Sequence, residues 1–130
     1  MRLGKRELLA RTLALARIPE LYLGLVGASE RLTVLAYHRV FDMRNEDEFP
    51  YDPELVSATP GDFSWQMEFV CRHFEAITFA RLIESLERAS PLPRRALIIT
   101  LDDGHRDNYE HAYPVLRRLG LSATIFLSTG

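Results

Sequence analysis

The chain has 130 residues, of which 47% are hydrophobic and 26% charged, and its formal net charge is -2. This is the composition of an ordinary globular domain with one modest core, and it gives no bulk attraction for nucleic acid, so we expect no nucleic-acid partner. The one cysteine, Cys71, excludes an internal disulfide and a multi-cysteine metal cluster, and we expect it to be buried on a helix.

Residues 1–30 are predicted to form an N-terminal amphipathic helical segment. Leucines alternate with arginines over residues 5–26, and Pro19 should kink the helix. Two interpretations stay open: a helix packed against the domain, or a basic helix in peripheral contact with a membrane. Arg11 and Arg17 interrupt the apolar stretch, so we expect no cleavable signal peptide and a cytoplasmic location, with membrane association as the alternative.

The first half of the remaining chain begins with a strand. Residues 32–37 form a nearly continuous apolar run, which predicts a strand buried on both faces, and the polar, aperiodic residues 41–57 predict a loop at a functional rim. Thr59 is a predicted N-cap, and Pro60 suits the first position of a helix. The apolar face of that helix is predicted to comprise Phe63, Met67, Val70 and Phe74, widened by Trp65 and Phe69.

The second half alternates strands and helices. In chain order, we predict a short strand at 76–79, a helix at 79–89 with Leu82, Ile83 and Leu86 facing inward, a buried strand at 96–101, a helix at 107–119 closed by Gly120, and a buried strand at 122–127. Such alternation is typical of α/β architecture with a parallel sheet.

Chemistry is expected where the strand at 96–101 ends, because active sites of parallel α/β folds lie at the carboxyl ends of strands. The strand runs directly into Asp102, Asp103, Gly104 and His105. Neighbouring side chains leave a strand in different directions, so one acid can bind a cation while the other faces water or substrate. The alternative stays open that Asp-Asp-Gly is only a turn with an aspartate cap.

Several ordered motifs surround these two acids. They are Leu35-Ala36-Tyr37-His38-Arg39-Val40, Thr100-Leu101-Asp102-Asp103-Gly104, Tyr113-Pro114-Val115-Leu116 and Gly120-Leu121-Ser122-Ala123-Thr124-Ile125-Phe126-Leu127. Together they resemble the polysaccharide deacetylase family, the NodB homology group, with Leu101 in place of that family's Phe. The resemblance implies that residues 31–130 are a partial domain, truncated at the C-terminus, with the α/β fold of the N-terminal portion of a distorted (β/α) barrel.

The resemblance also implies a function. A metal-dependent hydrolase would remove N-acetyl groups from a polysaccharide or oligosaccharide, with Asp103 as metal ligand and Asp102 as general base. The divalent metal would be zinc. Its two histidine ligands, and a general-acid histidine that follows them, are expected beyond residue 130, because none of the four histidines of this chain stands in the family's histidine motif. The chain alone is therefore expected to be inactive.

Other interpretations stay open. The domain could be an inactive glycan- or partner-binding remnant, or the two acids could belong to a magnesium or phosphotransfer site. His38 is either a rim residue near substrate or a structural histidine, and His105 is expected to pack; a substitute metal site of Asp103, His38 and His105 is a further alternative. His73 and His111 are expected to face solvent, and Tyr37, Trp65, Tyr109 and Tyr113 to be core residues.

Overall fold

The computed structural model describes residues 32–43 and 52–129. The helix predicted at 5–26, and with it the domain boundary near residue 30, lies outside these residues and stays a prediction. Among the described residues, no helix combines the length and the apolar character needed to span a bilayer.

The described elements alternate as the sequence predicts. In chain order they are β1 (Thr33–Tyr37), β2 (Arg39–Val40), the 3-10 helix η2 (Pro53–Leu55), β3 (Val56–Ala58), α3 (Pro60–His73), β4 (Glu75–Ala76), α4 (Phe79–Glu87), β5 (Ala96–Asp103), the π-helix η3 (Asn108–Ala112), α5 (Tyr113–Leu119) and β6 (Thr124–Leu127). Every strand pairing among the described residues is parallel. The predicted α/β class with a parallel sheet is therefore confirmed.

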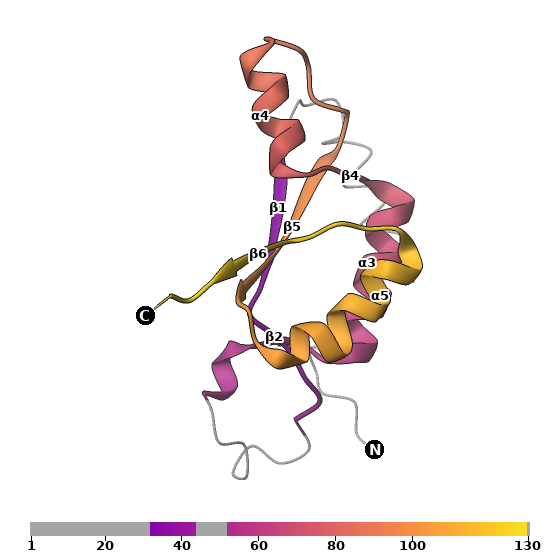
Figure 1. Ribbon diagram of the computed structural model, residues 1–130. Helices are drawn as coiled ribbons and strands as arrows, with labels where there is room; N and C mark the ends of the chain where they lie inside the picture. The colour runs from indigo at the N-terminus through magenta and orange to yellow at the C-terminus, as the bar shows by residue number, and fades with distance from the viewer. Residues whose placement is uncertain (1–31, 44–51, 130) are drawn as a thin grey trace.

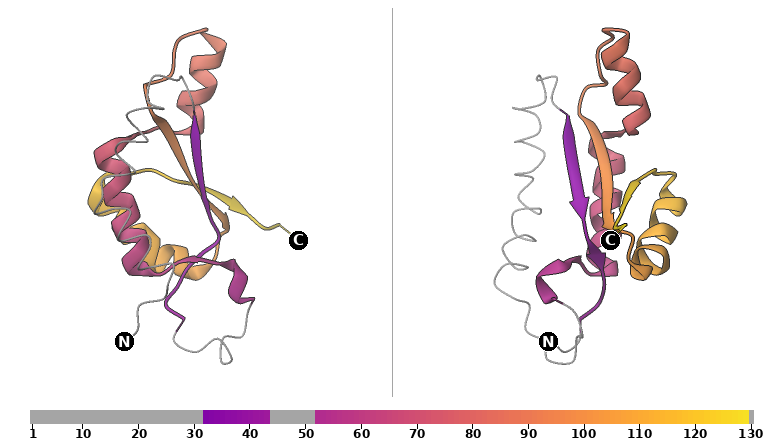
Figure 2. Two further views of the ribbon diagram at one scale, coloured as in Figure 1. Left: turned by 180° about the vertical axis from the view of Figure 1, so that it is seen from behind. Right: turned by 60° about the vertical axis from the view of Figure 1, so that its left-hand side comes forward.

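β5 is the central strand of the larger sheet. It pairs with β1 along one edge, with β4 beside its first residues and with β6 beside its last residues, while β2 and β3 form a separate two-stranded sheet. Helices α3 and α5 lie side by side next to this sheet, as the views in Figures 1 and 2 both show. Because the strands are parallel, the carboxyl ends of β1, β5 and β6 point the same way.

Alternate side chains of β5 enter two different apolar clusters. Leu97, Ile99 and Leu101 pack with the buried face of α3 and with α5. Ala96 and Ile98 pack on the other side, against a smaller cluster around Ile77 and α4. The predicted burial of β5 is confirmed. Because both faces of the strand are packed, the position of its carboxyl end relative to the helices is held by the core.

Helix α3 begins as predicted. The Thr59 side chain accepts a hydrogen bond from the backbone N–H of Asp62 at 3.1 Å, and Pro60 opens the helix. The predicted residues Phe63, Met67 and Val70 are fully or almost fully buried, at spacings of four and three that place them on one helical face. This face supplies the layer that covers one side of the sheet.

The outer strands differ from the sequence prediction. β1 was expected to be buried on both faces and β6 to be a buried strand, but Val34 is 50% exposed and Leu127 is 69% exposed. Among residues 32–43 and 52–129, α3 and α5 cover the side of the sheet that Leu35 faces, and β6 pairs only with β5. An apolar run shows that its side chains favour burial, but they are buried only where another element packs over them.

Three further predictions about side-chain burial are wrong. Ile83 and Leu86 are exposed on α4, whereas Ser85 is buried, so the helix contacts the sheet through Phe79 and Leu82 instead. Cys71 is exposed, because it follows the buried Val70 by about 100° around α3.

Element boundaries also shift in three places. The predicted loop at 41–57 overlaps β3 at residues 56 and 57, because Val56–Ala58 form this strand and pair with β2. Residues 44–51 of that loop lie outside the described part of the chain. The strand predicted at 76–79 is β4, Glu75–Ala76. The helix predicted at 107–119 consists of η3 followed by α5, and Gly120 ends it at φ 66°, as predicted.

Candidate active site

The two acids lie at the carboxyl end of β5, where the sequence predicts them. Asp102 is partly buried, whereas Asp103 is exposed and adopts φ 67°, followed by Gly104 at φ 66°. Aspartate is one of the few non-glycine residues that tolerate this left-handed conformation, and two successive residues in it turn the chain sharply away from the sheet. The turn leaves the two carboxylates in different surroundings.

His38 joins Asp102 at this edge. The β1–β5 register places Tyr37 opposite Leu101, so the next residue of each strand, His38 and Asp102, leaves the sheet side by side. The His38 Nδ1 atom lies 3.9 Å from Asp102 Oδ2, and the His38 backbone N–H donates to Ser57 Oγ at 2.9 Å. Of the two interpretations left open for His38, the structure favours a residue of the rim.

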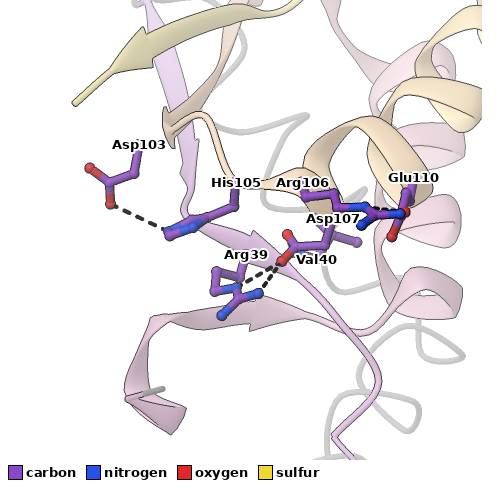
Figure 3. Close-up of polar contacts among 7 residues, drawn as sticks. All are labelled: Arg39, Val40, Asp103, His105, Arg106, Asp107 and Glu110. Carbon is purple, nitrogen blue, oxygen red and sulfur yellow. Dashed lines mark hydrogen bonds and ion pairs between the residues drawn. The ribbon is translucent and has the colours of Figure 1, made fainter. Parts of the chain in front are cut away.

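His105 contacts the other acid. Its Nε2 atom lies 3.6 Å from Asp103 Oδ2. Figure 3 draws this contact as a dashed line. This nitrogen is buried and has no hydrogen-bond partner of normal length among the described residues. The two imidazoles therefore contact different carboxylates, which does not fit a shared metal site of Asp103, His38 and His105.

A buried ion pair lies next to the acids and was missed by the sequence analysis. Asp107 Oδ2 accepts from Arg39 Nε at 2.7 Å and lies 2.6 Å from Arg39 Nη2 (Figure 3). Asp107 Oδ1 accepts from the backbone N–H of Val40 at 3.2 Å. The available signal was a charged residue, Arg39, two positions after the end of an apolar strand. Its partner could not be found from spacing, because the two residues are 68 positions apart.

The aromatic residues divide into two groups. Tyr37 is a core residue, as predicted: its ring meets Phe63 edge-on at 5.0 Å, and its hydroxyl donates to Gln66 Oε1 at 2.7 Å. Burial raises the pKa of Tyr37 to about 12, so the phenol is neutral at physiological pH. Tyr109 and Tyr113 were expected to be core residues, but they are exposed and their rings stack on each other.

Three remaining predictions about side chains need correction. Trp65 is half exposed on α3 rather than buried, although its ring stacks on Phe69. His73 and His111, expected to face solvent, are partly buried. The His73 ring lies 4.3 Å from the Phe69 ring and the His111 ring 6.3 Å from the Phe41 ring, so both imidazoles are in packing contacts.

An apolar cleft of about 500 Å³ adjoins the turn after β5. Residues of the turn, of η3 and α5, and of β6 line it. Asn108 is 3% exposed at its wall, and its carboxamide atoms have no hydrogen-bond partner within the described ranges. Gly104 and His105, which directly follow the two acids, thus connect the end of β5 to this cleft.

The described residues do not make a complete metal site. Within 32–43 and 52–129, no three histidine, cysteine, aspartate or glutamate side chains are grouped so that they could hold an ion. Asp103 offers one accessible carboxylate of the type that divalent cations bind, and Asp107 is committed to Arg39. A metal at this edge would need further ligands from outside the described residues.

The carboxyl end of β5 lies within a segment that matches a known protein family. Residues 89–130, which include β5, the turn and β6, match the family model described as polysaccharide deacetylase. The chain is 26% identical over 83 residues to a poly-beta-1,6-N-acetyl-D-glucosamine N-deacetylase of Escherichia coli (strain K12), covering 64% of this chain and 12% of the relative. It is 26% identical over 102 residues to the enzyme of the same name from Staphylococcus aureus (strain MSSA476), covering 74% of this chain and 35% of the relative.

Solved structures share the fold. Streptococcus pyogenes deacetylase PplD in complex with acetate aligns with a TM-score of 0.63 at 23% identity, covering 76% of this chain and 43% of that one. IcaB from Ammonifex degensii aligns with a TM-score of 0.59 at 26% identity, covering 74% and 37%. The described residues therefore have the fold of part of a polysaccharide deacetylase, and the chain spans less than half the length of these relatives.

Proposed function

We propose that this chain is part of a polysaccharide deacetylase, which hydrolyses N-acetyl groups of a carbohydrate polymer, because residues 89–130 match that family's model and the fold is shared with solved deacetylases. The names of the E. coli and S. aureus relatives favour a polymer of N-acetylglucosamine as substrate. The observation that carries the proposal is the rim itself: two adjacent carboxylates at the end of the central strand, with an imidazole 3.9 Å from one of them.

Each rim residue has a proposed role in amide hydrolysis. Asp102, partly buried and beside His38, takes a proton from the attacking water. His38 holds a proton at the same edge and delivers it to the departing amine as the C–N bond breaks, so that acetate and a free amine result. The general acid is thereby assigned to His38, beside the general base, rather than to the histidine beyond residue 130 that the resemblance implies.

Asp103 is the proposed carboxylate ligand of a divalent cation, which we expect to be zinc. When bound, the cation would polarise the acetyl carbonyl and acidify water. The other ligands, expected to be two histidines, would come from chain outside the described residues, since those residues hold no group of three ligands. We accordingly propose that the 130-residue chain by itself releases no acetate.

The test compares acetate release by the full-length protein and by two variants. We expect release from oligomers of β-1,6-linked N-acetylglucosamine, and Asp102→Asn should lower kcat about 10²–10⁴-fold, as loss of a general base does. Asp103→Asn should abolish stoichiometric binding of divalent metal, measured by elemental analysis. Asparagine tolerates the φ of 67° at this position, so this variant should remain folded.

The control is Glu110→Gln, which neutralises an exposed carboxylate on η3 that pairs with Arg106 at 2.7 Å. It should keep activity and metal content. Glycan binding without any acetate release by metal-loaded wild-type protein would contradict the hydrolase and favour the non-catalytic glycan-binding remnant. Full activity of Asp102→Asn would show that Asp102 is not the general base.

A further inference from the structure

We propose that the buried Arg39–Asp107 ion pair is a positioning device that sets His38 against Asp102. Its catalytic consequence rests on the proposed deacetylase function, whereas its geometric consequence does not. Arg39 directly follows His38 in the chain, and Asp107 follows Asp102 by five residues, across the turn at Gly104. The pair therefore joins the two backbone segments that carry the imidazole and the carboxylate.

The sheet itself does not fix the relative position of these two side chains. The β1–β5 ladder ends at Tyr37 and Leu101, one residue before His38 and Asp102, and the β2–β3 register is irregular between Arg39 and Val40. Beyond the last ladder pair, a second attachment is needed to hold the chain carrying His38 against the end of β5. Asp107 supplies it by bonding Arg39 through one carboxylate oxygen and the Val40 N–H through the other.

Both side chains of the Arg39–Asp107 ion pair are buried, which restricts the geometry of their contact. Arg39 is 8% exposed and Asp107 is 3% exposed, so neither side chain can exchange its partner for bulk water without moving the backbone. The Arg39 guanidinium also lies 5.7 Å from the Phe41 ring centroid, which restrains its plane. Because desolvation offsets much of the attraction in a buried ion pair, the main effect of such a pair is to select one geometry rather than to add stability.

A neighbouring ion pair provides a matched comparison. Arg106 and Glu110 form a 2.7 Å contact close to Asp107, but their side chains are 88% and 44% exposed and both lie on the same helical segment. Exposed pairs of this kind contribute little and join no separate elements. Removing the Glu110 charge should therefore leave the His38–Asp102 geometry unchanged.

The experiment follows position and catalysis separately in the full-length protein. The variants are Arg39→Lys, which keeps the charge but loses the two-nitrogen contact, Arg39→Leu, Asp107→Asn, and Glu110→Gln as control. NMR reports the His38 imidazole signals and the hydrogen-exchange protection of the Val40 amide. We expect both to change in the Arg39 and Asp107 variants, and kcat to fall about 10–100-fold with KM changed less than about two-fold.

The outcomes separate the two proposals. If Arg39→Leu does not fold, the test rests on Arg39→Lys, because lysine retains a buried cation next to Asp107. A folded Arg39→Lys protein with wild-type His38 signals and wild-type kcat would overturn the positioning role. If the wild-type protein proves inactive, the proposed function fails. The positioning role is still tested, because the His38 signals of the Arg39 and Asp107 variants either shift from those of wild type, which supports it, or stay unchanged, which contradicts it.

Discussion

Asp102 and Asp103 differ in surroundings although they are neighbours in the chain. The last ladder position of β5 with β1 is Leu101, so Asp102 emerges next to His38, whereas the left-handed φ of Asp103 turns its side chain toward His105. The sequence predicts both the position of these acids and their divergence. Their contacts with two different imidazoles come only from the way the turn and β1 meet.

Tyr37 gives a prediction at the scale of one side chain. Burial raises its pKa from 10.0 to about 12, so the folded protein keeps the phenolic proton over a pH range in which the unfolded chain loses it. The folded-state pKa is the higher one, so this stabilisation is complete below pH 10 and is lost as the pH rises toward 12. We expect the free energy of unfolding to fall by about 1 kcal/mol between pH 9 and pH 11 on account of Tyr37.

The measurement is urea-induced unfolding at the two pH values. Tyr37→Phe should be less stable than wild type at pH 9 by about 1 kcal/mol, because it loses the hydrogen bond to Gln66, but its stability should fall less on going to pH 11. Tyr109→Phe, at a position 73% exposed, should retain the wild-type pH dependence. An equal fall for Tyr37→Phe and wild type would show that the phenol is not the titrating group.

At the scale of elements, the turns after β5 and after α5 can be compared. Gly104 and Gly120 both have φ 66°. A Cβ at Gly104 would lie 2.5 Å from Leu127 Cδ2 of β6, whereas nothing lies within 4 Å of one at Gly120. Gly120→Ala should therefore cost about 1–2 kcal/mol for backbone conformation alone, and Gly104→Ala should cost more.

The test is the free energy of unfolding of both variants, each also made with Leu127→Ala. In that background the cost of Gly104→Ala should approach that of Gly120→Ala, because the obstructing side chain is gone. A Gly104→Ala cost that does not depend on Leu127 would mean that this exposed leucine moves aside freely, and that β6 does not constrain the turn bearing Asp103.

Helix α4 shows why element prediction and burial prediction differ in difficulty. Its amphipathic pattern correctly predicted a helix, yet Ile83 and Leu86 are exposed while Ser85 is buried. Periodicity specifies which side chains share a face. Which part of that face meets the sheet depends on where the helix axis lies, and no local pattern encodes that.

At the scale of the whole molecule, the β6 edge is the prominent exposed apolar feature. Ile125, Phe126 and Leu127 are each at least 50% exposed on a strand that pairs only with β5 among the described residues. Unpaired, apolar strand edges promote association of chains. We expect the 130-residue chain to self-associate as its concentration rises.

Sedimentation velocity over a range of concentrations checks this expectation. Ile125→Glu should lower the associated fraction, because a charge on an edge strand opposes edge-to-edge pairing. Ile83→Glu is the matched control: an isoleucine of similar exposure, 53% against 50%, placed on a helix away from the sheet edge. Equal effects of both substitutions would indicate that general surface hydrophobicity drives association rather than the β6 edge.

The sequence by itself determined the parts of this protein that depend on neighbours in the chain. The six buried residues that open β5, the Thr59 cap, the Gly120 helix end and the acids at the strand tip all follow from local conformational preference and periodicity. The exposure of Val34 and Leu127, the His38–Asp102 contact and the Arg39–Asp107 pair were decided by tertiary structure. These features depend on which segments meet in space, and for the Arg39–Asp107 pair the two residues are 68 positions apart. Side-chain burial and ion pairing are properties of that meeting rather than of either segment alone.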